Sequence, residues 1–139
     1  MNVKIEFDRK MRFIGKNSLS LETVFDTHPS AGGEDTAGAP MEIMLQALGA
    51  CSAMDVISII RKKRKEILKF NIFIEAEQND NHPKYFTKTH LIYELTSGDA
   101  EQSELDKAIE LSQKNYCSVS AMFQRSGCVV TYEGKIFRK

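Results

Sequence analysis

The stretch that decides the fold is Pro40-Met41-Glu42-Ile43-Met44-Leu45-Gln46-Ala47-Leu48-Gly49-Ala50-Cys51-Ser52-Ala53-Met54-Asp55-Val56, and it stays apolar to Ile60. A run that is apolar nearly all round predicts a helix that is covered on most sides. Pro40 is tolerated in a first helical turn. The cations that follow Ile60 suit the negative end of a helix, so we expect this helix to end at about Lys65.

A membrane span is the alternative interpretation of this stretch. Gln46, Ser52, Asp55 and Ser58 interrupt it. A carboxylate near the centre of a span costs about 2.5–3.5 kcal/mol even on the lenient insertion scale. We therefore expect the buried helix of a soluble protein, with no membrane partner.

Composition narrows the classes of protein that fit. The 139 residues predict a single domain over 1–139, and 42% apolar residues are enough for a packed core. Lys+Arg and Asp+Glu both number 19, so the chain has no net positive charge that would attract nucleic acid, and we expect no nucleic-acid partner. Three cysteines are too few for a disulfide scaffold. No signal peptide is visible, so we expect the cytoplasm, where thiols stay reduced.

The segments before the helix predict a small β meander. Val3–Phe7 alternates with period two, and Met11–Ile14 and Ser20–Phe25 continue the pattern. Gly15–Asn17 is expected to form a turn of this meander. Residues 28–39, which hold several glycines and a proline, are expected to form a loop.

The segments after the helix predict a hairpin, two helices and a last strand. Residues 68–77 and Phe86–Thr96 read as paired strands. Asp99, with Gln102 three residues later, predicts a helix start. Four residues then share one helical face: Leu105, Ala108, Ile109 and Ser112. Cys117–Phe123 predicts a short helix and Val129–Phe137 a closing strand, which makes the fold class α+β.

These residues resemble a known family. The Pro-Met-Glu start, the motif Leu48–Val56, the following Ile60–Arg64 and the later Tyr116-Cys117-Ser118-Val119 are similar to the OsmC/Ohr family over essentially the whole chain. The resemblance implies an OsmC-like fold in which strands wrap around two central helices of an intertwined homodimer. It also implies a two-cysteine peroxidase site near the subunit interface.

The resemblance assigns roles to individual residues. Family members reduce organic hydroperoxides with a first cysteine, here Cys51, and close a disulfide with a second, here Cys117. An arginine of the N-terminal region activates the thiolate, which makes Arg9 and Arg12 the candidates. The family's peroxidases carry a glutamate directly after the motif proline, whereas here Glu42 comes one residue later. The match is closer to the poorly characterised branch of the family than to its proven peroxidases.

Thiol chemistry leaves two functions open. The thiolate is the nucleophile, and a free cysteine has a pKa of about 8.5 that apolar burial raises. An arginine beside Cys51 would favour a peroxidase that acts on a small apolar hydroperoxide and is recycled by a dithiol reductant. An all-apolar shell would instead favour a non-catalytic protein that binds a small apolar ligand or senses oxidant.

The remaining polar candidates are expected to play structural parts. Cys128 begins a predicted strand and is expected in the core. The histidines show no ligand spacing, so we expect neither a metal nor another cofactor. Asp55 shares a helix face with Cys51 and is expected to cap a buried polar network or to pair with a basic residue. The basic run Arg61–Lys65 is expected to be a solvated helix end.

Overall fold

The computed structural model describes all residues from 1 to 139 as two compact units, Met1–Gln46 and Ala47–Lys139. The longest helix, α1 (Pro40–Lys62), begins in the first unit and continues in the second. The expectation of one domain over 1–139 stays a prediction.

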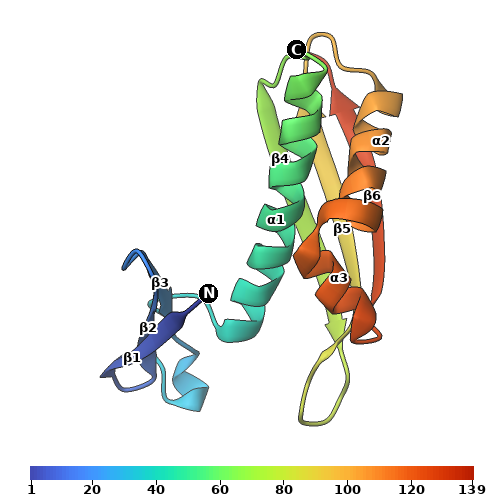
Figure 1. Cartoon of the computed structure of the whole chain (residues 1–139). Coiled ribbons are helices and arrows are strands. Elements are labelled where there is room, and N and C mark those ends of the chain that lie inside the picture. Colours follow the sequence, from blue (N-terminus) through green and yellow to red (C-terminus); the bar gives the residue numbers. More distant parts are fainter. The chain divides into compact units, whose positions relative to one another are not determined.

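The first unit contains an antiparallel sheet of β1 (Val3–Arg9), β2 (Arg12–Asn17) and β3 (Glu22–Phe25), in that order (Figure 1). This confirms the expected meander, but the turn predicted at Gly15–Asn17 is wrong because those residues belong to β2. The chain turns after Asn17 instead. The Asn17 side-chain oxygen accepts hydrogen bonds from two later backbone N–H groups, at 2.9 and 3.0 Å, and so forms the turn itself.

A buried carboxylate organises the loop that follows β3. Asp26 accepts hydrogen bonds from the backbone N–H of Thr27 at 2.8 Å and from the N–H and hydroxyl of Thr36 at 3.1 and 2.5 Å. The Thr36 hydroxyl is the main reason that the pKa of Asp26 is lowered to about 2. One carboxylate therefore ties together a loop that has only a short 3₁₀ turn, Pro29–Ala31, of its own.

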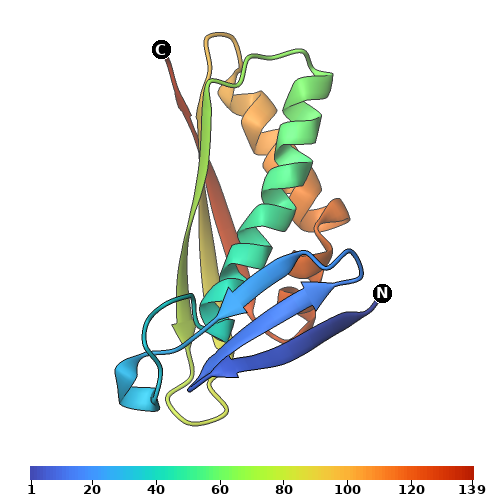
Figure 2. The ribbon, with the colours of Figure 1, turned by 90° about the vertical axis from the view of Figure 1, so that its left-hand side faces the viewer.

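The second unit is built on a mixed sheet. β4 (Lys69–Gln78) and β5 (Phe86–Thr96) form the predicted hairpin, and β6 (Val129–Phe137) lies parallel to β5 on its other side. Figures 1 and 2 show α1, α2 (Gln102–Leu111) and α3 (Ser118–Arg125) on one face of this sheet. Alternate residues of β5 face the helices and are buried, which confirms the α+β class.

Small and apolar side chains let α1 approach the sheet. Leu48, Val56 and Ile60 are fully buried. A Cβ atom on Gly49 would lie 3.1 Å from the Ile74 side chain, so a residue without a side chain brings α1 close to β4. By length and composition alone α1 could cross a membrane. One side of α1 packs on the sheet and five of its 23 residues are buried, so the single chain does not cover the helix on most sides as the sequence predicts.

Two helix boundaries differ from the sequence prediction. α1 ends at Lys62 rather than Lys65, and Arg64 adopts a left-handed backbone with φ 59°. α2 is capped by Glu101 together with Glu104 rather than by Asp99. The Asp99 carboxylate instead accepts a hydrogen bond from the N–H of Glu66 at 2.8 Å. The four residues predicted on the inner face of α2 and its extension are all buried, as expected.

We predict that the loop after β3 loosens in acid. The pKa of Asp26 is lower when folded than its usual 3.8, so its contribution to stability is complete above pH 4 and is lost as the pH falls toward 2. Asp26→Asn should raise the hydrogen-exchange rate of the Thr36 amide at pH 7. Asp35→Asn, in the same loop but exposed, is the control. Equal exchange rates in the two variants would contradict this account.

Candidate active site

The structure brings Cys51 and Cys117 together from distant parts of the sequence. Cys51 lies in α1 and is partly exposed, whereas Cys117 is 3% exposed at the start of α3. The pKa of Cys117 is raised to about 11, mainly because the thiol is buried; the hydrogen-bonded Cys51 thiol and the charge of Asp55 add to this, and the N–H of Ser120 opposes it. The two thiols therefore form a pair within the second unit.

The backbone around Cys117 fixes the position of its thiol. A five-residue π-helical turn, Ser112–Tyr116, joins α2 to Cys117. The Cys117 N–H donates to the carbonyl of Ser112 at 2.7 Å, and the Cys117 sulfur accepts from the N–H of Ser120 at 3.3 Å. π-helical turns occur frequently at functional sites. Here the turn and the cap set where the second thiol meets the first.

A chain of buried hydroxyl groups runs beside the thiols and ends on a carboxylate. Ser112 donates to Asp55 at 2.8 Å. The Ser52 hydroxyl lies 2.8 Å from that of Ser112 and 2.5 Å from that of Tyr93. Since a carboxylate only accepts, Ser112 must use its one proton there, so Ser52 donates to Ser112 and Tyr93 donates to Ser52. All the hydrogen bonds of the chain point toward Asp55.

Gln113 connects this hydroxyl chain to the residues that hold Cys117. Its amide nitrogen donates to the Tyr93 hydroxyl at 2.7 Å and to the Ser52 hydroxyl at 3.3 Å. Its amide oxygen accepts from the Ser120 hydroxyl at 2.5 Å. Gln113 is 4% exposed, so these bonds replace the water it loses on burial. We call Ser52, Asp55, Tyr93, Ser112, Gln113 and Ser120 the polar network.

An open groove adjoins the network where α1 faces the end of α2 and the π-helical turn. Its volume is about 380 Å³, and Asp55 and Tyr116 line it together with Ser58, Ile59, Lys62 and Leu111. Asp55 is partly exposed, so it forms the end of the polar network nearest to solvent. The groove therefore has a mixed polar and apolar lining next to the polar network.

The fold and the thiol pair agree with one family of proteins. A model of OsmC-like proteins matches residues 32–133, which is well over half of the chain. This chain belongs to the OsmC-like family. The family resemblance that the sequence carries is therefore confirmed.

Some relatives of this OsmC-like protein have names that state no activity, and others are described as organic hydroperoxide resistance proteins. Protein YhfA of Escherichia coli K12 is 29% identical over 126 residues, 91% of each chain. A hypothetical protein from Aquifex aeolicus is 30% identical, with a TM-score of 0.85 over 99% of this chain and 96% of that one. An organic hydroperoxide resistance protein OsmC from Legionella pneumophila shares the fold at 15% identity, with a TM-score of 0.67 over 96% and 95%.

The three remaining site candidates of this OsmC-like chain lie in the first unit, and each has a partner there. Arg9 Nε lies 3.0 Å from Glu34, and the lowered pKa of Glu34 reflects this pairing. Arg12 donates to the Thr36 hydroxyl at 2.6 Å. Its Nε also lies 3.0 Å from Asp8, in an orientation that pairs charges without forming a hydrogen bond.

Glu42 has a structural role at the start of α1. Its carboxylate accepts a hydrogen bond from the N–H of Ala39 at 3.0 Å, which satisfies a free backbone donor of the first turn. The catalytic roles that the family resemblance gives to Glu42 and to the two arginines stay predictions.

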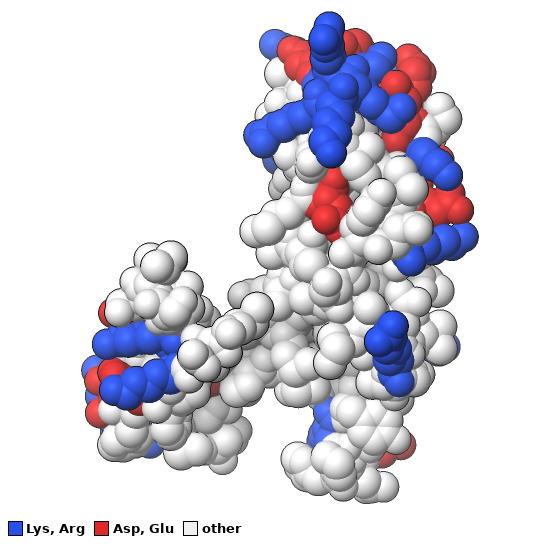
Figure 3. Space-filling view, viewed as in Figure 1, with Lys and Arg blue, Asp and Glu red and all other residues white.

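Other polar candidates lie outside the thiol pair. Cys128 is buried beside Thr89 in the core, as expected. His28 contacts Asp35 at 2.6 Å, and His90 contacts Thr131 at 2.7 Å on the outer face of the sheet. Arg61–Arg64 are exposed at the end of α1, where Figure 3 shows basic side chains gathered.

Sequence reasoning found part of the polar network. The expectation that Asp55 caps a buried polar network is confirmed by its bond from Ser112. Ser112 carried a signal, because it is a polar residue on the predicted inner face of a helix. Tyr93, Gln113 and Ser120 carried none that distinguishes them from ordinary strand and helix residues.

We predict that Gln113→Ala destabilises the protein by about 2 kcal/mol or more, because it leaves buried hydroxyl groups without partners. Gln124→Ala is the matched control. Gln124 also bonds to Ser120 but is exposed, so its loss should cost less than about 1 kcal/mol. Urea denaturation measures both. Equal losses in the two variants would show that the network contributes little to folding.

Proposed function

We propose that this OsmC-like protein is a thiol-dependent peroxidase that reduces organic hydroperoxides, with Cys51 as the peroxidatic residue and Cys117 as the resolving residue. The observation that carries the proposal is the pairing of these two thiols beside the polar network. The Legionella pneumophila relative, which shares the fold, is described as an organic hydroperoxide resistance protein. That name supports the same class of reaction here.

In the first proposed step, Cys51 attacks the hydroperoxide. With a pKa of about 11, only about one Cys117 in ten thousand is a thiolate at pH 7. Cys51 is also the more exposed of the two thiols. Its thiolate attacks the terminal oxygen of the hydroperoxide, the O–O bond breaks, and the alkoxide leaves and takes up a proton. Cys51 becomes a sulfenic acid and the peroxide is reduced to an alcohol.

The second step uses Cys117 as the thiol that closes the disulfide. Its sulfur attacks the Cys51 sulfur, and the departing hydroxide combines with the Cys117 proton to form water. A dithiol reductant then opens the disulfide by exchange, becomes a disulfide itself, and returns both cysteines to thiols. No metal or organic cofactor takes part.

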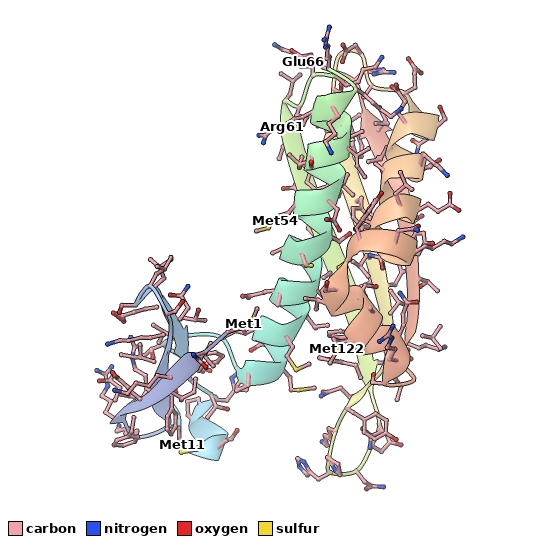
Figure 4. All side chains as sticks on the ribbon, in the orientation of Figure 1. Met1, Met11, Met54, Arg61, Glu66 and Met122 are labelled. Atoms are coloured by element: carbon pink, nitrogen blue, oxygen red, sulfur yellow. The ribbon has the colours of Figure 1, made fainter.

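Exposed apolar side chains close to the two cysteines in the sequence favour an apolar substrate. Met54 follows Cys51 by one helical turn and is 73% exposed, and Met122 on α3 is 70% exposed (Figure 4). Flexible thioether side chains adapt to apolar ligands of different shape. We therefore propose small organic hydroperoxides rather than hydrogen peroxide as the substrate.

A second candidate function is a non-catalytic OsmC-like protein that binds a small apolar ligand or senses oxidant. The observation that favours it is the pairing of Arg9 with Glu34 and of Arg12 with Asp8, because a paired arginine is less able to stabilise a thiolate. Oxidation of Cys51 without repeated turnover would distinguish this candidate from the peroxidase.

We predict that the purified protein with a dithiol reductant consumes cumene hydroperoxide faster than hydrogen peroxide. Cys51→Ser should abolish turnover. Cys117→Ser should allow one oxidation of Cys51 to sulfenic acid and block the second step, because resolution needs the second thiol. Cys128→Ser is the matched control and should turn over like the wild type.

Variants of the two arginines distinguish the two candidate functions in the same assay. The family resemblance predicts that either Arg9→Gln or Arg12→Gln slows oxidation of Cys51 strongly, while the other has little effect. Negligible turnover by the wild type, together with no effect of either arginine, would contradict the peroxidase and leave the binding or sensing role.

We also propose that the chain forms a homodimer in which a second copy covers α1. Only five of the 23 residues of α1 are buried. The outer side of the helix carries exposed Met54 and a groove of about 560 Å³ that Ile57 and Ser58 also line. An apolar helix of this length is stable in water when another surface covers it. Location in the cytoplasm stays a prediction.

Sedimentation equilibrium should therefore give twice the mass of the chain at micromolar concentration. Met54→Glu should shift the equilibrium toward the monomer, because it places a charge in the covered surface. Ser103→Glu, on an exposed position of α2, should leave the mass unchanged. A folded wild-type monomer under these conditions would contradict the dimer.

A further inference from the structure

We infer that Gln113 is a positioning residue for disulfide closure, because its side-chain amide holds together the two segments that carry Cys51 and Cys117. The use of that disulfide to resolve an oxidised Cys51 rests on the proposed function. The positioning of the two thiols is argued from the contacts of Gln113 and is tested without a peroxide.

At one end, Gln113 bonds to the residue that follows Cys51. Its amide nitrogen donates to the Ser52 hydroxyl at 3.3 Å and to the Tyr93 hydroxyl at 2.7 Å. Ser52 and Tyr93 are both fully buried, so these bonds are shielded from water. Since Ser52 is the neighbour of Cys51 in α1, the bonds restrain how α1 turns about its own axis at the first thiol.

At the other end, Gln113 bonds to the residue that holds the second thiol. Its amide oxygen accepts from the Ser120 hydroxyl at 2.5 Å, and the Ser120 N–H donates to the Cys117 sulfur at 3.3 Å. Ser120 is fully buried in α3. One amide therefore bridges the residue next to Cys51 in α1 and the residue that contacts the Cys117 sulfur in α3.

An amide side chain matches the hydrogen-bonding needs of both ends. Tyr93 donates its proton to Ser52, and Ser52 donates its proton to Ser112, so only hydroxyl lone pairs face Gln113 at the first end. That end needs N–H donors. The Ser120 hydroxyl donates at the second end and needs an acceptor. An amide presents both groups, whereas a carboxylate presents only acceptors.

Disulfide closure is sensitive to such a bridge. The two sulfurs must reach a separation of about 2.05 Å with a dihedral angle near 90° about the new bond. Loosening either segment lowers the effective concentration of one thiol at the other, and the disulfide becomes easier to reduce. A general loss of stability does not have this effect while the protein stays folded, because thiols and disulfide are compared within the folded state.

The test equilibrates the full-length protein with reduced and oxidised glutathione. Mass spectrometry of acid-quenched samples measures the fraction of chains that are linked between Cys51 and Cys117. In this exchange the two protein thiols are oxidised to a disulfide, and one glutathione disulfide is reduced to two thiols. Gln113→Ala should lower the effective concentration about tenfold or more, which raises the reduction potential by about 30 mV.

Leu105→Ala is the control for a loss of stability alone. Leu105 is fully buried in α2 and lies about two helical turns before Ser112. Its truncation creates a cavity in the core and destabilises the fold without removing a hydrogen bond of the polar network. The effective concentration in this variant should stay within about twofold of the wild type. A decrease as large as that in Gln113→Ala would overturn the inference.

Two further variants cut the bridge at one end each, and they also make the comparison if Gln113→Ala fails to fold. Gln113→Glu keeps an acceptor for Ser120 but removes the donor to Ser52. Ser120→Ala removes the hydroxyl and keeps the N–H bond to Cys117. Each should lower the effective concentration, and Ser120→Ala should add no further loss to Gln113→Ala because both act on one bridge. Unchanged values in the single variants, or additive losses in the double variant, would overturn the inference.

The inference and the proposed function can fail separately. A disulfide whose potential depends on Gln113, in a protein that consumes no hydroperoxide, would support the positioning role and contradict the peroxidase. Hydroperoxide turnover with a potential that does not depend on Gln113 would contradict the positioning role alone. A wild-type protein that forms no disulfide between Cys51 and Cys117 would contradict both.

Discussion

The hydrogen bond from Ser112 to Asp55 sets the arrangement of the whole site. Because this bond takes the only proton of the Ser112 hydroxyl, the direction of every other hydroxyl in the chain follows from it. The same residue holds the backbone of Cys117 through its carbonyl. The network therefore helps to determine where the second thiol lies.

The cost of burying this many polar groups explains why the network is complete. An unsatisfied buried hydroxyl or amide costs about 1–3 kcal/mol, so a half-formed network would be worse than an apolar core. Gln113 satisfies this demand by bonding to Tyr93, Ser52 and Ser120 at once. Gln113 follows Ser112 directly in the π-helical turn, and both side chains are buried.

The elements with strong periodicity could be predicted from the sequence. The hairpin of β4 and β5, the last strand and the long apolar helix all follow from their patterns, and the family resemblance selected Cys51 and Cys117. The predictions of a turn at Gly15–Asn17 and of a helix cap at Asp99 were wrong for local reasons. Glycine is typical of turns, but Gly15 lies within β2, where the ring of Phe25 packs closely against it. The helix cap at Glu101 competed with Asp99, whose carboxylate is used by Glu66.

The polar network could not be predicted because its partners are far apart in the sequence. The alternation of β5 predicts that Tyr93 points inward but not that it meets Ser52 and Gln113. Periodicity also gives no sign of a π-helical turn. These contacts exist only once α1, β5 and the turn are packed together, so a single sequence shows their members as ordinary residues.

The most direct test of the account counts thiols after one equivalent of cumene hydroperoxide, without reductant. The pairing of Cys51 with Cys117 predicts that two of the three thiols in each chain disappear. Peptide mapping should then find these two residues linked within one chain, with Cys128 free. Retention of all three thiols, or linkage through Cys128, would contradict the central claim that the fold builds a reactive pair from these two cysteines.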